Sequence, residues 1–283
     1  MGVRQPGRPL RAADRARRRL PAPAYDGGAP GGLSGNTRRT GGVGAVVKIE
    51  IWSDVVCPWC YIGKRRIENA LAEFAHADEV EVHWRSYQLD PGAPAVPTEN
   101  TTAMLARKYG QSPDGAKQMQ DRVEAVAAEE GLVYRLSETL HLNTVDAHRV
   151  IHLAHEQGGN ELQGRVKEAL LKAYFTEARN VADHAVLREL AVAAGLDGAR
   201  VDEVLAGTEF TQDVHADVEQ AQAYGATGVP FFVIDEKYGV SGAQPTEVFS
   251  QVLEKAWSAS HPKIEVLATG DAGEACGPDG CAI

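Results

Sequence analysis

The sequence predicts an α/β fold in which a β-α-β unit and a β-β-α unit are separated by a long helical stretch. Apolar and charged residues alternate at 47–51 and again at 80–84, on either side of a segment with helical spacing. Two further short strands, 230–235 and 239–241, precede a last helix over 245–257. The roughly 140 residues between the two units are too many for a loop and carry helical patterns, so we expect a helical insertion.

The first unit begins with a strand that buries one face. Val47, Ile49 and Ile51 alternate with charged residues, and the pattern stops shortly after them. A helix over 58–74 follows, because its apolar side chains recur every three or four positions. Proline suits the start of this helix, since its missing N–H has no partner there in any case. The second strand is expected to end near Leu89.

Start and stop signals divide the stretch between the two units into helices. Ser112 and Asp183 are typical N-cap residues, Asn143 is expected to cap another helix, and Gly158-Gly159 is expected to end it. A further helix is expected to end at Tyr224 and lead back into the sheet. We therefore divide the chain into a basic arm, a first half-domain, a helical insertion, a second half-domain and a tail, with the bounds 1–45, 46–92, 93–224, 225–260 and 261–283.

The composition excludes several classes of protein. The chain has 283 residues, 43% hydrophobic and 24% charged, which is enough to bury a sizeable core. No window approaches the roughly 18 consecutive apolar residues of a membrane span, so no membrane association is expected. Residues 1–44 carry a net charge of +7 and the rest of the chain −17. The acidic remainder repels phosphate backbones, so we expect no nucleic-acid partner.

The first 45 residues form an arm that the sequence predicts to be disordered. The arm is rich in Arg, Gly and Pro and has no apolar periodicity. No apolar core of a secretory signal follows Arg17, Arg18 and Arg19, so a cytoplasmic location is expected. Because this composition is typical of translated upstream DNA, and because the first strand begins at Val46 or Val47, we infer that much of the arm is not native protein.

The strongest chemical signal is Cys57-Pro58-Trp59-Cys60, between the first strand and its helix. Two cysteines three residues apart on the first helical turn can form a disulfide, and the unpaired N–H groups of the helix start favour a thiolate on the first of them. Cys57 could then attack a disulfide and Cys60 could resolve the mixed disulfide. The alternative is half of a zinc site, which is less favoured because zinc pairs usually lie on turns.

A second signal is Gly228-Val229-Pro230, directly before an apolar strand. A proline at a strand start is either an edge feature or a cis peptide bond. Together with the cysteine motif, it makes the chain resemble the DsbA-like branch of thioredoxin-fold proteins, and more closely the FrnE-like oxidoreductases. The resemblance covers about residues 47–260 and is carried by three segments, Trp52-Ser53-Asp54-Val55-Val56-Cys57-Pro58-Trp59-Cys60-Tyr61-Ile62-Gly63, Asn143-Thr144-Val145-Asp146-Ala147-His148-Arg149 and Ala173-Tyr174-Phe175-Thr176-Glu177.

This resemblance implies a thioredoxin-like fold with an inserted all-helical domain. It implies that Pro230 is cis and lies beside the Cys57 sulfur, and that the Val229 backbone pairs with an extended substrate segment. Trp59, next to Pro58, would then favour apolar peptides, although it could equally be a half-exposed ring with no such role. Asp54 could assist proton transfer or simply cap the turn.

The tail holds a second cysteine pair, Cys276 and Cys281, in a turn rich in Gly and Pro. A mobile dithiol could exchange electrons with Cys57, and tails of this spacing are similar to those of some FrnE-like members. Three alternatives remain open: a stable disulfide without a catalytic role, a zinc site completed by Cys57 and Cys60, or a metal-binding tail alone.

His148, His152 and His155 fall on one helical face, where they could bind a metal. We expect no metal site, because no fourth ligand or carboxylate is evident beside them. The resemblance places this helix over the groove of the site, where His148 or Arg149 could contact a substrate. The sequence carries no phosphate-binding loop, no dinucleotide fingerprint and no serine nucleophile elbow.

The sequence therefore predicts a thiol–disulfide oxidoreductase, acting as a reductase or isomerase on protein or peptide disulfides. No prosthetic group is expected, because the dithiol is itself the redox group, and glutathione is a candidate co-substrate. A thiol reductant such as glutathione or thioredoxin would be the partner. Two other functions compete. One is a glutathione-dependent isomerase or transferase of the 2-hydroxychromene-2-carboxylate isomerase type, which needs no second cysteine, and the other is a structural zinc protein.

Overall fold

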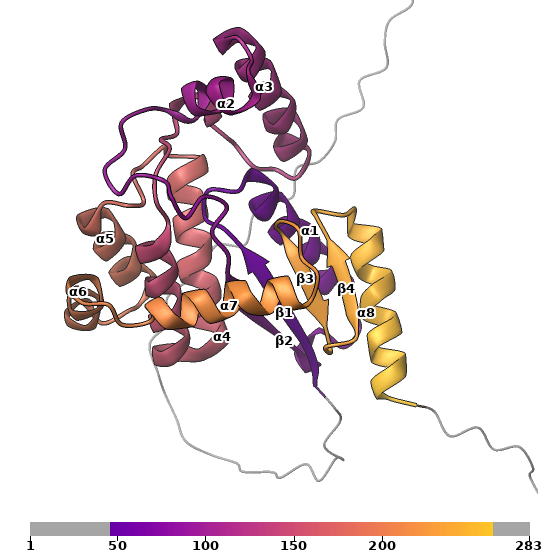
Figure 1. Ribbon diagram of the computed structural model, residues 1–283. Helices are drawn as coiled ribbons and strands as arrows, with labels where there is room; N and C mark the ends of the chain where they lie inside the picture. Colours follow the sequence, from indigo (N-terminus) through magenta and orange to yellow (C-terminus); the bar gives the residue numbers. More distant parts are fainter. Residues whose placement is uncertain (1–45, 263–283) are drawn as a thin grey trace, which may run out of the picture. The chain divides into compact units, whose positions relative to one another are not determined.

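A computed structural model describes residues 46–262 of the chain. Its four strands form one mixed sheet in the order β2-β1-β3-β4 (Figure 1). The central strand β1 pairs parallel with β2 and antiparallel with β3, and β3 pairs antiparallel with β4. The strands are β1 Val47–Ser53, β2 Val80–Ser86, β3 Phe231–Ile234 and β4 Tyr238–Ser241.

Helices cover both faces of this sheet. Helix α1, which contacts α8, lies on the face where Ile49, Ile51 and Phe232 are buried. Helix α7 crosses the opposite face, where Trp52 and Phe231 pack together (Figure 1). The bounds of these helices are α1 Pro58–Glu73, α7 Thr211–Ala223 and α8 Thr246–Ser260. The alternation of apolar residues along β1 and β3 thus serves two separate cores.

The remaining helices lie between β2 and β3 in the sequence, as the periodicity predicts. They are α2 Thr101–Tyr109, α3 Pro113–Glu129, α4 Val145–Phe175, α5 His184–Ala194 and α6 Gly198–Ala206, with short 3-10 turns at Ala77–Glu79 and Leu136–Glu138. We call residues 101–223, from α2 to α7, the helical segment. Within the part of the chain described here, no helix is both long enough and apolar enough to cross a membrane.

Most of the predicted helix boundaries are confirmed. Ser112 and Asp183 cap α3 and α5 through side-chain hydrogen bonds to backbone N–H groups. The N-cap of α4 is Thr144 instead of Asn143, whose side chain accepts a hydrogen bond from the N–H of Val145. Gly158 and Gly159 have non-helical backbone angles and divide α4 at a kink into two helices, so the predicted helix stop is confirmed.

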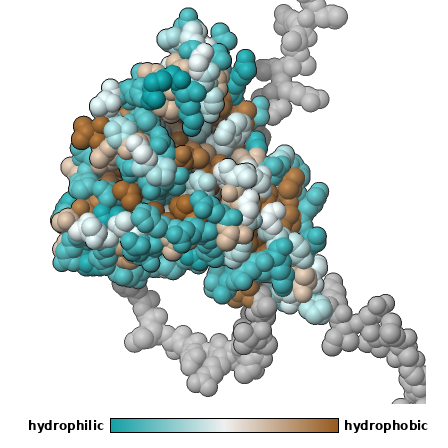
Figure 2. Space-filling model, in the orientation of Figure 1, coloured by the Kyte–Doolittle hydropathy of each residue, from teal (hydrophilic) through white to brown (hydrophobic). Residues whose placement is uncertain are grey.

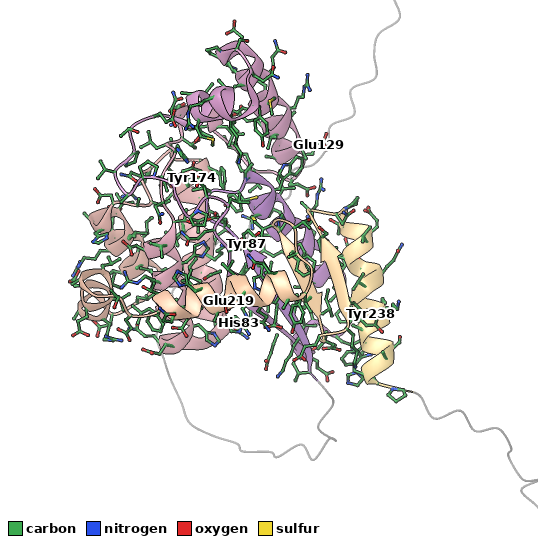
Figure 3. All side chains as sticks on the ribbon, viewed as in Figure 1. His83, Tyr87, Glu129, Tyr174, Glu219 and Tyr238 are labelled. Atoms are coloured by element: carbon green, nitrogen blue, oxygen red, sulfur yellow. The ribbon has the colours of Figure 1, made fainter. Side chains whose placement is uncertain are left out.

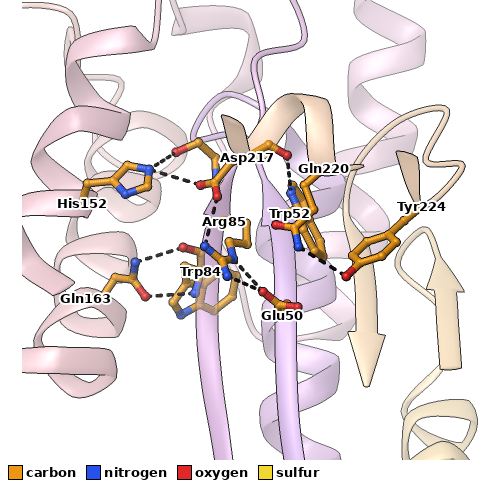
Figure 4. Close-up of polar contacts among 10 residues, drawn as sticks. Glu50, Trp52, Trp84, Arg85, His152, Gln163, Asp217, Gln220 and Tyr224 are labelled. Carbon is orange, nitrogen blue, oxygen red and sulfur yellow. Dashed lines mark hydrogen bonds and ion pairs between the residues drawn. The ribbon is translucent and has the colours of Figure 1, made fainter. Parts of the chain in front are cut away.

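The free edge of β2 is covered by side chains of α4 and α7 (Figure 4). The amide of Gln163 accepts from the N–H of Trp84 and donates to its carbonyl, both at 2.9 Å. The Asp217 carboxylate accepts from the N–H of Ser86 at 2.7 Å. An edge strand would otherwise expose unpaired backbone groups, so these bonds attach the helical segment to the sheet.

Candidate active site

The two motif cysteines lie at the junction of β1 and α1. Cys57 is the N-cap residue of α1, and Cys60 lies in its first turn. Both are free thiols, with 3% and 1% of their surface exposed. Pro58 occupies the first helical position and is half-buried, and Trp59 is 40% exposed. The motif therefore presents an indole to solvent beside a largely covered dithiol.

Pro230 lies across from this motif at the start of β3. The Val229–Pro230 peptide bond is cis, which is one of the two alternatives that the sequence leaves open. The Cys57 thiol donates a hydrogen bond to the Val229 carbonyl, with 3.5 Å between sulfur and oxygen. Helix α1 approaches this loop closely, because a Cβ at Gly63 would lie 3.0 Å from Cγ of Pro230. Val229 remains half-buried and so partly accessible beside the sulfur.

Opposing effects act on the thiol of Cys57. The neighbouring Cys60 thiol raises the pKa of Cys57 well above its usual value, and burial and the Asp54 carboxylate raise it further. The backbone N–H of Cys60 lowers the pKa, as expected at a helix N-terminus, although the Cys57 side chain makes no capping hydrogen bond here. Two adjacent thiolates repel each other, so the reduced pair carries at most one.

Three buried ionisable side chains lie behind the motif. Asp54, His148 and Lys167 each have about 1% of their surface exposed. The Asp54 carboxylate lies 3.2 Å from Nε2 of His148 and accepts a hydrogen bond of 2.8 Å from the N–H of Leu89. The Lys167 ammonium donates to the carbonyl of Ser53 at 3.2 Å. Nδ1 of His148 has no hydrogen-bond partner among the described residues.

Burial changes the titration of this group of side chains. It lowers the pKa of Lys167 to about 8, against the attraction of Cys60, Asp54 and Cys57, which raises it. Burial also lowers the pKa of His148, against the hydrogen bond and charge of Asp54, which raise it. For Asp54, burial acts to raise the pKa, but the hydrogen bond and charge of His148 outweigh it and the pKa is lowered. Strongly perturbed groups beside a reactive dithiol are typical of functional sites.

Tyr134 contacts the motif from the helical segment. Its hydroxyl donates a 2.8 Å hydrogen bond to the Pro58 carbonyl, and its ring packs against those of Tyr61 and Phe175, whose centroids lie 6.0 and 4.7 Å away. The side chain is 7% exposed, and burial raises its pKa, with the two cysteines adding to the effect. The Tyr134 hydroxyl therefore stays protonated and can act only as a donor toward this carbonyl.

Apolar surface surrounds the motif. Figure 2 shows apolar atoms gathered in the middle of the visible face, between the α2–α3 pair and α7. Trp59 and Leu89 are 40% and 44% exposed, and the N–H of Leu89 is bonded to Asp54. Tyr87, marked in Figure 3, packs with Val229 against the Trp52 core. A chain laid beside Val229 would thus meet apolar side chains.

The three histidines of α4 do not converge on a metal. His148 contacts Asp54, His152 lies within 3.1 Å of the Asp217 carboxylate, and the His155 ring stacks on His83. Over residues 46–262, no group of three or more potential ligands could hold a metal ion. Cys276 and Cys281 lie outside the described residues.

Two further groups of polar side chains on α4 contact other parts of the protein. His148 and Arg149 are largely buried, as Cys57 is, and the expectation that either contacts a substrate stays a prediction. Arg149 donates to backbone carbonyls, that of Glu209 among them. The hydroxyl of Ser86 and the Asp217 carboxylate both meet Nε2 of His152, at 3.0 and 3.1 Å (Figure 4). A nucleophile and its orienting acid need different ring nitrogens, so this is not a catalytic triad.

Sequence reasoning missed Lys167 and Tyr134. A signal for Lys167 exists, because it falls on the buried stripe of α4 that Gln163 and Leu170 also share. A lysine on such a stripe must be solvated by protein groups. Tyr134 gives no comparable signal, since it lies in a connection between helices and no periodicity marks it.

The dithiol at a strand-to-helix junction, opposite a cis proline, defines a thioredoxin-fold protein. The DSBA-like thioredoxin domain family matches residues 48–254, and the chain belongs to it. The YwbO protein of Bacillus subtilis is 30% identical over 213 residues, covering 73% of this chain and 96% of that protein. A crystal structure of a probable DsbA oxidoreductase from Streptomyces coelicolor is 46% identical with a TM-score of 0.72, covering 84% of this chain and 99% of that one. The cytosolic disulfide reductase DsbM of Pseudomonas aeruginosa, solved with glutathione, shares the fold at 17% identity and a TM-score of 0.50, covering 74% and 98% of the two chains.

Proposed function

We propose that the chain is a thiol–disulfide oxidoreductase that reduces or isomerises protein or peptide disulfides through Cys57 and Cys60. One observation carries this proposal: two free thiols share the first turn of α1, and the first of them lies 3.5 Å from the carbonyl of Val229 beside the cis proline. Membership of the DSBA-like family supports it. A structural zinc protein is the alternative from another class of function, and the experiment below distinguishes the two.

In the proposed reaction, the Cys57 thiolate attacks one sulfur of a substrate disulfide. A mixed disulfide forms, and the other substrate sulfur leaves as a thiolate and takes up a proton. Cys60 then loses its proton and attacks the Cys57 sulfur, which releases the second substrate thiol. The substrate gains two electrons and two protons, and the enzyme is left with the Cys57–Cys60 disulfide. A thiol reductant such as glutathione or thioredoxin returns the two electrons, and no prosthetic group is required.

We propose that the buried side chains behind the motif handle the proton of Cys60. Asp54, His148 and Lys167 lie within mutual electrostatic reach, and the pKa of Lys167, lowered to about 8, is close to neutral pH. A group that titrates near the working pH can both accept and return a proton. The proton transfer would then fall to Lys167, whereas Asp54, whose lowered pKa makes it a poorer proton acceptor, would hold the turn through Leu89 and orient His148.

We further propose that an extended substrate segment pairs with the backbone of Val229. Strand addition next to the cysteines would bring a substrate sulfur to Cys57. Trp59, Leu89 and Tyr87 would supply an apolar surface for the substrate side chains. Pro58 leaves this surface open, because it carries no backbone N–H that could compete for the substrate.

The test is a pair of cysteine variants assayed with a disulfide-bonded protein such as insulin. We expect Cys57→Ser to abolish reduction and Cys60→Ser to accumulate a mixed disulfide that a gel or mass spectrum detects. Equal activity of Cys57→Ser and the parent would refute the proposal, and so would a folded state that depends on zinc. A glutathione titration then gives the direction: about −250 mV or below indicates a reductase, and about −120 to −180 mV an oxidase or isomerase.

A role of Cys276 and Cys281 as an accessory redox pair remains a proposal from the sequence. If they exchange electrons with Cys57, the Cys276→Ser/Cys281→Ser variant should shift the titration or slow the turnover of insulin. An unchanged titration and turnover would leave the tail without a redox role. A cytoplasmic location would suit reductase work, and fractionation of the source cells tests it.

A further inference from the structure

The helical segment donates a hydrogen bond to the peptide unit between Pro58 and Trp59, directly after the N-cap residue Cys57. The acceptor is the carbonyl of Pro58, and the donor is the hydroxyl of Tyr134, 2.8 Å away and 76 positions along the chain. The carbonyl of the first helical residue already has a ladder partner in the N–H four residues on. Its second lone pair is free for a side chain. The hydrogen bond from Tyr134 therefore adds to the helical hydrogen bond of the Pro58 carbonyl and does not replace it.

The same peptide unit carries the N–H of Trp59. Resonance couples the two ends of a peptide group, so a hydrogen bond to the carbonyl makes the N–H a stronger donor. Trp59 is the second residue of α1, and an N–H at this position has no partner within the helix. The side chain of the N-cap residue is the usual acceptor for such a group. Here the N-cap residue is Cys57.

The protonation state of Cys57 decides which contact its sulfur makes. As a thiol, it donates to the carbonyl of Val229. As a thiolate, it can no longer donate and must accept. The N–H of Cys60 acts on the sulfur but also bonds the Cys57 carbonyl at 3.0 Å, whereas the N–H of Trp59, at the same helix start, has no helical partner and is the second donor available. Anything that strengthens the Trp59 donor therefore stabilises the ionised form over the neutral one.

We propose that Tyr134 is a positioning residue that stabilises the Cys57 thiolate by polarising the Pro58–Trp59 peptide. Its ring is buried and packs against Tyr61 and Phe175, so the hydroxyl is held in place. The inference rests on the proposed function, because it concerns the reactivity of the same dithiol. It assigns control of that reactivity to the helical segment.

The test compares Tyr134→Phe with Tyr174→Phe. Tyr174, marked in Figure 3, is also buried and also donates a 2.8 Å hydrogen bond to a backbone carbonyl, that of Leu140. We expect Tyr134→Phe to slow alkylation of Cys57 at neutral pH by about two- to fourfold, since one bond strengthens the next by about 10–30%. The pH profile of alkylation should shift upward, and Tyr174→Phe should leave rate and profile unchanged.

The same change should appear in the equilibrium with glutathione. Losing thiolate stabilisation favours the disulfide where the reduced pair is ionised, so above the pKa of Cys57 a threefold shift toward the disulfide would lower the reduction potential by about 14 mV. A fluorinated tyrosine placed at position 134 is a stronger donor and should shift rate and equilibrium the opposite way, which keeps the test decisive even if Tyr134→Phe folds poorly.

Two negative outcomes are distinguishable. If the parent protein shows no reactive dithiol, the proposed function fails. If the parent exchanges disulfides but Tyr134→Phe and the fluorinated variant match Tyr174→Phe in alkylation rate, pH profile and equilibrium, the role of Tyr134 alone is refuted.

Discussion

The buried ammonium of Lys167 should cost the protein stability while it supports the dithiol. The side chain is 1% exposed, and its pKa is lowered from 10.5 to about 8 by burial. At neutral pH, a pKa lowered by this much means that the charge of Lys167 reduces the free energy of unfolding by about 3 kcal/mol, because each pKa unit is worth about 1.4 kcal/mol. Lys167→Met keeps most of the volume and removes the charge. It also loses the hydrogen bond to Ser53, worth about 1 kcal/mol.

We therefore expect Lys167→Met to raise the free energy of unfolding at pH 7 by about 2 kcal/mol. This gain in the free energy of unfolding must become smaller as pH rises. Between pH 8 and 10.5 the unfolded chain binds more protons at this lysine than the folded one, so the parent becomes more stable as pH rises. By pH 9.5 the cost of the charge falls to about 1 kcal/mol, and the two proteins should be nearly equal in stability.

Urea unfolding of both reduced proteins at pH 7 and pH 9.5 measures this difference. Lys64→Met is the matched control, because Lys64 is also buried but is paired with Glu68 and Glu168 at 2.5 and 2.6 Å. That variant should lose about 1 kcal/mol at both pH values, since it breaks two ion pairs to partly exposed carboxylates that Arg65 still holds. A Lys167→Met protein that is less stable than its parent at pH 7, by an amount independent of pH, would refute the reasoning. Insulin reduction by Lys167→Met should slow several-fold, because the ammonium attracts the thiolates.

Three further predictions concern packing and pH. Gly63→Ala should lower the free energy of unfolding by about 1–3 kcal/mol and slow disulfide exchange, because the new Cβ would press on Pro230. Gly164→Ala is the control: its new Cβ would meet nothing closer than 3.7 Å, so thermal unfolding should show a gain of about 0.5–1 kcal/mol in stability. Gln163→Leu should lower the free energy of unfolding in urea by about 2–4 kcal/mol, since it leaves the N–H and the carbonyl of Trp84 in β2 buried and unpaired. A loss below about 1 kcal/mol would contradict this prediction. Burial lowers the pKa of His83 to about 4, so stability should fall as pH drops from about 6.5 to 4, and His83→Gln should flatten that fall in a series of melts.

Local patterns in the sequence account for most of the fold. The alternation in β1 and β2 and the capping residues of α3 and α5 each depend on neighbours within a few positions. Helix α2 is not evident from the sequence, because it is only nine residues long and none of them is buried. By contrast, the interruption of α4 at Gly158 and Gly159 is predictable, because the backbone angles of the two glycines break the helix locally.

The candidate site is only partly predictable for a different reason. The two cysteines and Pro230 are marked by motifs at chain junctions. Their surroundings are contacts between distant positions: Tyr134 reaches Pro58 across 76 positions, and Lys167 reaches Ser53 across 114. A single sequence carries no record of such pairs, so neither the lowered pKa of Lys167 nor the donor on the Pro58 carbonyl could be inferred.

The origin of these groups bears on how the dithiol is controlled. Asp54 and the cysteines belong to the β1–α1 junction, but Tyr134, His148 and Lys167 all come from the helical segment. The motif supplies the two sulfurs and the helix start, which any protein with the same motif shares. The charges and the extra donor that act on those sulfurs are specific to the way the helical segment packs on the sheet. Substitutions in α4 and in the connection after α3 should therefore change the reactivity of the dithiol without altering a motif residue.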